Sequence, residues 1–293
     1  MPALRVAVIG PGLMGRGIAT LFAHSGARVG IVGTSLTRAQ DSLRTLDDAG
    51  AGSFEAVELE SRFVADADLV VESVRETLAE KREVLAAVDA VNSGGLLVTN
   101  TSSLDLDALS EVLSRPQRFA GMHFLNPPTE TWVIEVVGCR HTEPAELDSL
   151  CEVTRGLGRL PLVLHKPVAG YVWNRLQFAL LRECLHLLEE GVCDVDTIDA
   201  AVSEGLAPRW LAVGPLGTVD LGGPAVFGQI AAELFPLLGC EPGLVDAFPE
   251  SGGAGFHSWS PDERGRRQRL RVQALRMARD LRSTRALAPE ASR

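Results

Sequence analysis

The stretch LRVAVIGPGLMG at residues 4–15 decides the fold that this sequence predicts. An apolar run typical of a buried strand leads into three glycines, and an Ala-, Ile- and Leu-rich segment typical of a helix follows them. In this context Gly10 permits a tight turn, Gly12 lets backbone approach a pyrophosphate, and Gly15 lets helix and strand pack closely. The sequence therefore predicts a dinucleotide-binding loop, with an ordinary βα turn as the alternative; its residues are Gly10, Gly12, Leu13, Met14 and Gly15.

Outward from this loop, strand-like and helix-like segments alternate. Strands are predicted at residues 27–32, 68–72, 95–99, 119–123, 132–137 and 160–164, and helices at about 36–48 and 78–91. Such alternation is typical of βαβ units and a mostly parallel sheet. Later segments, at 171–190, 194–204, parts of 216–238 and 262–281, look helical. The fold class is therefore α/β, with a Rossmann-type, mostly parallel sheet domain that binds NAD(P) at residues 1–166. An all-helical domain for substrate binding and dimerisation follows at residues 167–293, and its apolar 171–190 helix predicts a homodimer.

The end of the second predicted strand bears on the choice of cofactor. An Asp or Glu there would bind the 2′-hydroxyl of the adenosine ribose, but residues 31–35 read IVGTS and contain no acid. Thr34, Ser35 and the nearby Arg38 would accept a 2′-phosphate, so the cofactor is predicted to be NAD or NADP, with NADP at least tolerated. Arg38 as an ordinary solvated helix residue remains an equal alternative.

Composition excludes several classes of protein. The chain has 293 residues, 46% of them hydrophobic, which rules out a disordered chain, a collagen and a small disulfide scaffold. A net charge of −10 argues against nucleic-acid and membrane partners, although residues 261–293 carry ten Arg against four acids. We interpret that basic segment as an interface element; a solvated face and a nucleic-acid tail are the alternatives. Five widely spaced cysteines, no signal peptide and no apolar span predict a cytoplasmic protein without a metal site.

A second group of polar residues suggests chemistry. His123 lies in GMHFLNP at residues 121–127, and Glu135 lies in IEVV at residues 134–137, both near predicted strand ends. A histidine with an orienting carboxylate suits a general base, because the carboxylate stabilises the imidazolium and fixes the tautomer. Taken singly, His123 would more often be structural and Glu135 a paired surface acid.

Together these segments give the chain a resemblance. It is similar to the 3-hydroxyacyl-CoA dehydrogenase family from about Arg5 to Arg282, through GPGLMGRGIA, VVESVRETLAEK, NTSSL, GMHFLNPP, VIEVV and VAGYVWNRLQ. Within that family its second half resembles the L-gulonate 3-dehydrogenase and lambda-crystallin branch. The resemblance implies that His123 is the catalytic base with Glu135 as its partner, and that Ser102 and Asn174 bind the reacting oxygen. It also implies that Glu76 and Lys81 lie at the edge of the cofactor cleft, with an exposed helix ion pair as the alternative.

Two departures from the thioester enzymes bear on the substrate. The chain reads PRW…GP within residues 208–215 where those enzymes typically read PMGP. The interval of about 20 residues between Asp48 and Asp68 is also too short for their CoA-binding helical insertion. Both favour a small hydroxy or keto acid, with Arg209 as the carboxylate partner or, alternatively, an Arg paired within the helical domain.

The resemblance thus implies an NAD(P)-dependent oxidoreductase that acts on the 3-hydroxyl or 3-keto group of a small 3-hydroxy acid. A 3-hydroxyacyl-CoA or acyl-carrier-protein thioester is the alternative substrate. A non-catalytic, crystallin-like structural protein is the alternative function, against which the retained Ser102, His123, Glu135 and Asn174 argue.

Overall fold

The structure of the protein is a computed structural model that describes residues 3–46, 49–92, 94–239 and 256–286. The chain forms two compact units, Met1–Asn174 and Arg175–Arg293, which are described separately.

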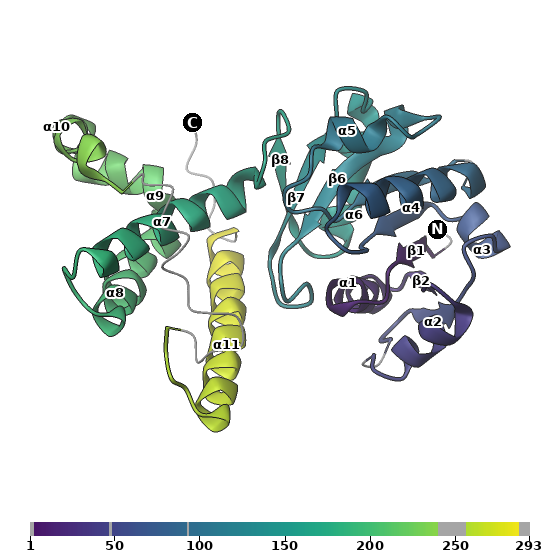
Figure 1. Ribbon diagram of the computed structural model, residues 1–293, viewed down its shortest axis with the longest axis horizontal. Coiled ribbons are helices and arrows are strands. Elements are labelled where there is room, and N and C mark those ends of the chain that lie inside the picture. The colour runs from purple at the N-terminus through teal and green to yellow at the C-terminus, as the bar shows by residue number, and fades with distance from the viewer. Residues whose placement is uncertain (1–2, 47–48, 93, 240–255, 287–293) are drawn as a thin grey trace. The chain divides into compact units, whose positions relative to one another are not determined.

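Unit 1 is built on an eight-stranded sheet in the order β3-β2-β1-β4-β5-β6-β7-β8. Figure 1 shows the strands of this unit with its helices around them. The strands are β1 Arg5–Ile9, β2 Arg28–Val32, β3 Ser53–Ala56, β4 Leu69–Glu72, β5 Leu96–Thr99, β6 Phe119–Phe124, β7 Val133–Gly138 and β8 Leu160–Leu164. Every neighbouring pair is parallel except β6 and β7, which run antiparallel. The predicted Rossmann-type, mostly parallel sheet is confirmed. The chain order reverses between β1 and β4, the place where open α/β sheets bind ligands.

The helices of unit 1 are α1 Leu13–His24, α2 Leu36–Leu43, α3 Arg62–Ala65, α4 Leu78–Val91, α5 Leu106–Ser110, the 3-10 turn η1 Pro116–Arg118 and α6 Pro144–Gly156. The helix predicted over about 36–48 ends earlier, at Leu43. The Ser42 carbonyl accepts hydrogen bonds from both the N–H and the hydroxyl of Thr45, which closes the last turn. The sequence did not predict β3, α3, α5 or α6. All but α6 span five residues or fewer, too short for a clear period.

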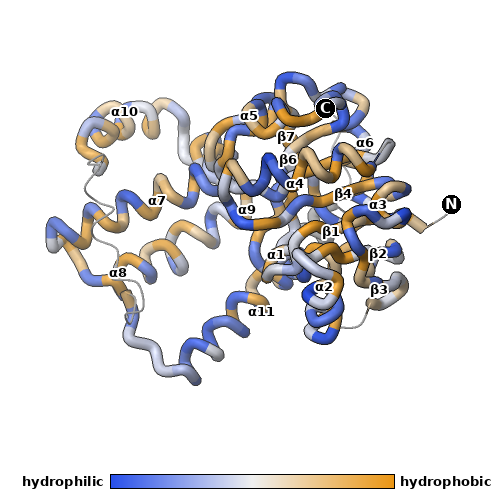
Figure 2. The backbone as a smooth tube through the Cα atoms, turned by 45° about the vertical axis from the view of Figure 1, so that its right-hand side comes forward, coloured by the Kyte–Doolittle hydropathy of each residue, from blue (hydrophilic) through white to orange (hydrophobic). Residues whose placement is uncertain are grey.

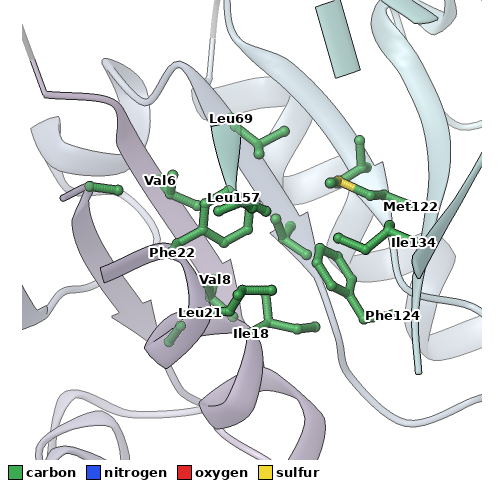
Figure 3. Close-up of a cluster of buried hydrophobic side chains, with 14 of the residues drawn as sticks. Val6, Val8, Ile18, Leu21, Phe22, Leu69, Met122, Phe124, Ile134 and Leu157 are labelled. Carbon is green, nitrogen blue, oxygen red and sulfur yellow. The ribbon is translucent and has the colours of Figure 1, made fainter. Parts of the chain in front are cut away.

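The core lies on both faces of the sheet, because successive strand residues point to opposite sides. On one face Val6 and Val8 of β1 pack with Phe22 of α1 and Phe124 of β6 (Figure 3). On the other face Ala7 and Ile9 belong to a cluster that includes buried residues of α4, α5 and the start of α7. In Figure 2 the strands of this unit carry much of the hydrophobic colour. His123 and Glu135 lie on this second face, so the polar residues discussed below are surrounded by apolar packing.

Every regular element among the described residues of unit 2 is a helix or a helical turn, as predicted. This unit contains most of α7 (Tyr171–Glu189), α8 (Val195–Ala200), the π-helical turn η2 (Ala201–Leu206), α9 (Ala207–Gly222), α10 (Pro224–Leu234), the 3-10 turn η3 (Phe235–Leu237) and α11 (Pro261–Ala286). Gly214, with φ of 76°, kinks α9 just before Pro215. Within the described part of the chain, no helix combines the length and apolar character that crossing a membrane requires.

Candidate active site

The glycine loop has the geometry that its sequence predicts. Gly10 follows β1 with φ of 104°, and a Cβ there would lie 2.6 Å from the carbonyl oxygen of Ser73. A Cβ on Gly15 would overlap the carbonyl oxygen of Gly10, whereas one on Gly12 would meet nothing within 4 Å. Glycine is thus required at 10 and 15 by close backbone packing, while the space beside Gly12 is open to an approaching ligand.

The N-terminus of α1 is suited to a pyrophosphate. Its N-cap, Gly12, has no side chain to satisfy the first N–H groups, and the first turn, which holds Leu13 and Met14, has no acidic residue. Free N–H groups and the positive end of the helix dipole therefore face outward at the β1–β4 switch. The residues present fit a dinucleotide.

At the end of β2, Ser35 and Arg38 come together in one turn. The Ser35 hydroxyl accepts a hydrogen bond from the backbone N–H of Arg38 at 3.2 Å and caps α2. Thr34, Ser35 and Arg38 are all exposed, and α2 has no acidic residue in its first turn. The first turn of α2 therefore presents a hydroxyl, a cation and the positive end of a helix beside the end of β2.

His123 and Glu135 are brought together by the antiparallel pairing of β6 with β7, in which they are direct cross-strand partners. Imidazole Nδ1 lies 2.7 Å from Glu135 Oε2, and Nε2 lies 3.2 Å from the hydroxyl of Ser102. Glu135 is fully buried and His123 is 4% exposed. The structure thus assembles three of the four predicted catalytic residues into one hydrogen-bonded chain.

The carboxylate of Glu135 determines which nitrogen of His123 is free. Its Oε1 accepts hydrogen bonds from the backbone N–H groups of Val172 and Trp173, both at 2.9 Å, at the start of α7. Because an ionised carboxylate only accepts hydrogen bonds, its Oε2 requires the proton on Nδ1 of His123. Nε2 then carries a lone pair and points at Ser102, the arrangement that a general base needs.

Glu76 holds the turn that carries Ser102. Its Oε1 accepts from the Thr101 hydroxyl at 2.6 Å and from the N–H groups of Ser102 and Ser103 at 2.7 and 3.1 Å. Burial alone would raise the pKa of Glu76. The hydrogen bond from Thr101, the charge of Lys81 and the two N–H donors outweigh burial and lower that pKa below its usual value. Glu76 is therefore held as a carboxylate.

Lys81 is a buried cation. Its ammonium group is 2.8 Å from Glu72 Oε1 and 3.4 Å from Glu76 Oε2, and the residue is 1% exposed. Glu72, which ends β4, also accepts from the N–H of Val74 and the hydroxyl of Thr99. The ion pair is therefore not the exposed helix pair considered from the sequence. Sequence reasoning missed Glu72, although an acid that ends the buried run LVVE is a signal that could have identified it.

The structure does not bring the remaining predicted residues into this chain of hydrogen bonds. Asn174 lies in the first turn of α7 and forms no hydrogen bond with Ser102, His123 or Glu135 in the described part of the protein. Arg209 is exposed on α9 and belongs to unit 2.

Glu76→Gln is expected to reduce kcat about tenfold. If the glutamine amide directs its oxygen at the turn of residues 101–103, its NH2 group faces the Lys81 ammonium, so the turn that carries Ser102 is held less well. The unfolding free energy should fall by about 1 kcal/mol, since Glu76 is partly solvated. The pKa of Glu76 is lower in the folded protein. The Glu76 carboxylate therefore contributes its full stabilisation at pH values above its pKa in the unfolded protein. This stabilisation is lost as the pH falls through its pKa in the folded protein.

The difference in unfolding free energy between wild type and Glu76→Gln should therefore become smaller at acid pH. Urea unfolding of both proteins at several pH values measures this difference. Glu80→Gln is the matched control, because the ion pair that Glu80 forms within the described residues is with the exposed Arg75, at 2.7 Å. Equal effects of the two substitutions on kcat would contradict a special role for Glu76.

Comparison with known families covers both units. A sequence model of the 3-hydroxyacyl-CoA dehydrogenase NAD binding domain matches residues 5–167, and a model of the 3-hydroxyacyl-CoA dehydrogenase C-terminal domain matches residues 170–245. The Arg-rich helix α11 therefore lies entirely beyond both matches.

Three related proteins illustrate the range of similarity. The chain is 28% identical to 5-formyl-3-hydroxy-2-methylpyridine 4-carboxylate 5-dehydrogenase of Mesorhizobium japonicum, over 92% of this chain and 95% of that protein. It is 30% identical to lambda-crystallin of Oryctolagus cuniculus, over 74% of each. A crystal structure of a 5-formyl-3-hydroxy-2-methylpyridine 4-carboxylic acid 5-dehydrogenase, an NAD+ dependent dismutase, superposes with a TM-score of 0.85 at 27% identity. That match covers 95% of this chain and 98% of the other.

Proposed function

The chain belongs to the 3-hydroxyacyl-CoA dehydrogenase family, and from that premise we propose that it oxidises a small 3-hydroxy acid with His123 as the base. It is an NAD-dependent oxidoreductase acting on a CH–OH group. The observation that carries the proposal is the hydrogen-bonded chain from Glu135 through His123 to Ser102, in a domain with an open glycine loop.

The residues divide the chemistry between them. NAD+, when bound, supplies the acceptor for the hydride that leaves the carbinol carbon. Nε2 of His123 takes the proton of the substrate hydroxyl, and Glu135 stabilises the imidazolium that forms. The Ser102 hydroxyl, 3.2 Å from Nε2, binds the reacting oxygen, with Asn174 as a second donor. In the reverse direction the same imidazolium returns the proton to the developing alkoxide.

The proposed substrate is a free acid rather than a thioester. The described residues between α2 and β4 form only the short elements β3 and α3, and the interval of 25 residues from 44 to 68 is too short for a long helical insertion. A relative matched over nearly its whole length acts, by its name, on a pyridine carboxylate. We propose that Arg209 pairs with the substrate carboxylate.

Incubation with NAD+ and matched pairs of 3-hydroxy acids and their CoA or carrier-protein thioesters tests this proposal, with the absorbance of NADH as the readout. Higher kcat/KM for the free acids supports it. Oxidation of the thioesters alone would replace it by the thioester alternative, and Arg209→Ala should raise KM for acids only.

NADP use is proposed from the end of β2. Ser35 and Arg38 share one turn, Thr34 precedes them, and no acid stands there to repel a 2′-phosphate. Calorimetric titration with NADH and NADPH tests this proposal. Binding of NADH without any binding of NADPH would contradict it, and weaker binding of NADPH alone to Arg38→Ala would support it.

A second candidate activity is aldehyde oxidation. The match to an NAD+ dependent dismutase extends over 95% of this chain, a share that requires much of the region beyond residue 245. A hydrated aldehyde carries a hydroxyl proton for His123 and a C–H hydride, and its oxidation gives a carboxylic acid. NADH, if it stayed bound, would supply the hydride for reduction of a second aldehyde to an alcohol, and His123 would return the proton to its oxygen. Equal amounts of acid and alcohol from one aldehyde would support this activity.

We also propose that unit 2 forms a homodimer. Large apolar side chains are exposed on its helices, among them Leu176, Phe178, Leu216, Leu221 and Phe235. Light scattering after size-exclusion chromatography tests the proposal, and a monomeric mass at micromolar concentration would contradict it. We further propose that residues 1–166 bind the cofactor and that residues 167–293 bind substrate and form the dimer. We also propose a cytoplasmic location.

A further inference from the structure

Tyr171 is a buried residue for which the proposed reaction has no role. It lies where α7 begins and is 1% exposed, and its hydroxyl has no hydrogen-bond partner among the described residues. Burial, followed by the charges of Glu76 and Glu135, raises its pKa far above the usual value. The hydroxyl therefore stays protonated, and it donates to no described residue, so the contacts of Tyr171 with the site are made by its ring and its backbone.

The ring of Tyr171 packs against the proposed base. Its centroid is 5.3 Å from that of the His123 imidazole, with an angle of 53° between the two planes. Strand residues two apart share a face, so Gly121 and His123 of β6 lie beside Glu135 and Val137 of β7. A Cβ on Gly121 would lie 3.0 Å from the Tyr171 hydroxyl oxygen and 2.8 Å from Val137 Cγ1. Glycine at 121 therefore leaves space for the hydroxyl end of the Tyr171 side chain beside His123.

The backbone of Tyr171 serves the same pair from the other side. Its φ of 47° is the one positive value among the described non-glycine residues, and Gly170 before it has φ of 78°. A left-handed residue followed by helical ones turns successive N–H groups toward a common point, which suits an anion. Here the N–H groups of Val172 and Trp173 both donate to Oε1 of Glu135. The unfavourable backbone thus places two donors on the carboxylate that orients His123.

We propose that Tyr171 is a positioning residue: its ring holds the His123 imidazole against Glu135, and its left-handed backbone delivers two N–H donors to that carboxylate. The inference rests on the proposed role of His123 as the base. The ring blocks rotation of the imidazole away from Ser102, and the two donors keep Glu135 from following. Tyr171 touches no reacting atom and acts only through these two residues.

Two substitutions separate the ring from the hydroxyl. Tyr171→Phe removes a buried group without a partner, so kcat should stay within about twofold while the midpoint of urea unfolding rises. Tyr171→Met keeps the site filled but removes the flat ring. It should lower kcat about tenfold and leave KM for NAD+ unchanged, because the imidazole is no longer held in one orientation.

The decisive readout is nitrogen-15 NMR of the histidines in the protein without cofactor or substrate, with His123→Ala used for assignment. Wild type and Tyr171→Phe should show one neutral tautomer of His123 with the proton on Nδ1, and Tyr171→Met should show averaged signals. If Tyr171→Met does not fold, Tyr171→Leu, which also lacks the flat ring, should give the same averaging. Wild-type signals in whichever of these two folds, or a loss of kcat in Tyr171→Phe equal to that in Tyr171→Met, would overturn the proposal. If the protein oxidised none of the 3-hydroxy acids or thioesters, the proposed function would be contradicted. The NMR measurement of the His123 tautomer would still test the role of Tyr171.

Discussion

Replacing His123 by alanine is expected to lower kcat by about 10²- to 10⁴-fold, the usual contribution of a positioned general base. The affinity for NAD+ should change by less than about twofold, because the glycine loop does not depend on this side chain. The effect is expected in both directions of the reaction, since the same nitrogen takes and returns the proton. Steady-state kinetics together with equilibrium cofactor binding measure both quantities.

His141→Ala is the matched control for this substitution. His141 is an exposed histidine just beyond β7 and lies outside the hydrogen-bonded chain from Glu135 to Ser102. It should leave kcat unchanged. A His123→Ala variant with wild-type kcat would remove the base from the mechanism and revive the crystallin-like alternative.

Replacing Lys81 by methionine is expected to reduce the unfolding free energy by about 3–5 kcal/mol, the usual cost of leaving one member of a buried ion pair uncompensated. Methionine preserves most of the side-chain volume, so the loss arises from the charge of Glu72, which has no exposed surface. Urea unfolding followed by fluorescence measures the loss. Because Lys81 also lies beside Glu76, kcat should fall as well.

The cause can be separated from simple loss of packing. In the double variant Glu72→Gln/Lys81→Met no buried charge remains at position 72. Its unfolding free energy should therefore be higher than that of the single variant Lys81→Met. Arg82→Met, one residue along α4, breaks a pair with Glu111 that is largely solvated and should cost less than about 1 kcal/mol. Equal effects of Lys81→Met and Arg82→Met would show that the buried pair has no special weight.

The prediction of the fold succeeded where side chains follow one strong period. The run before Gly10 was identifiable because burial on both faces produces a continuous apolar strand. The loop was identifiable by the spacing of its three glycines, and the helix from Tyr171 by its length and apolar composition. Edge strand β3 and the single turn of α3 were missed, because each has only four residues, too few for its pattern to be distinguished from chance. In the predicted 194–204 helix, the change from α8 to the π-helical η2 was not visible either, since no residue type marks a π turn.

The sequence placed His123 and Glu135 in one site, and the antiparallel register does make them direct neighbours; their catalytic roles stay a prediction. The interactions formed by side chains from different elements could not be predicted. The sequence offered an exposed helix pair for Lys81, but Glu72 at the end of β4 pairs with it in the interior. Tyr171 looked like part of an apolar helix, and only its positive φ and its contact with the imidazole reveal another role.

The most direct test of the central claim follows the hydride itself. A 3-hydroxy acid that the enzyme oxidises is prepared with deuterium on its carbinol carbon, and the NADH formed is analysed by mass spectrometry. Wild type should transfer the deuterium to NADH. His123→Ala should do so far more slowly, with a larger isotope effect on kcat, because the chemical step has become rate-limiting. NADH without deuterium, or equal rates of transfer by wild type and His123→Ala, would contradict the claim that His123 is the base of a hydride-transfer enzyme.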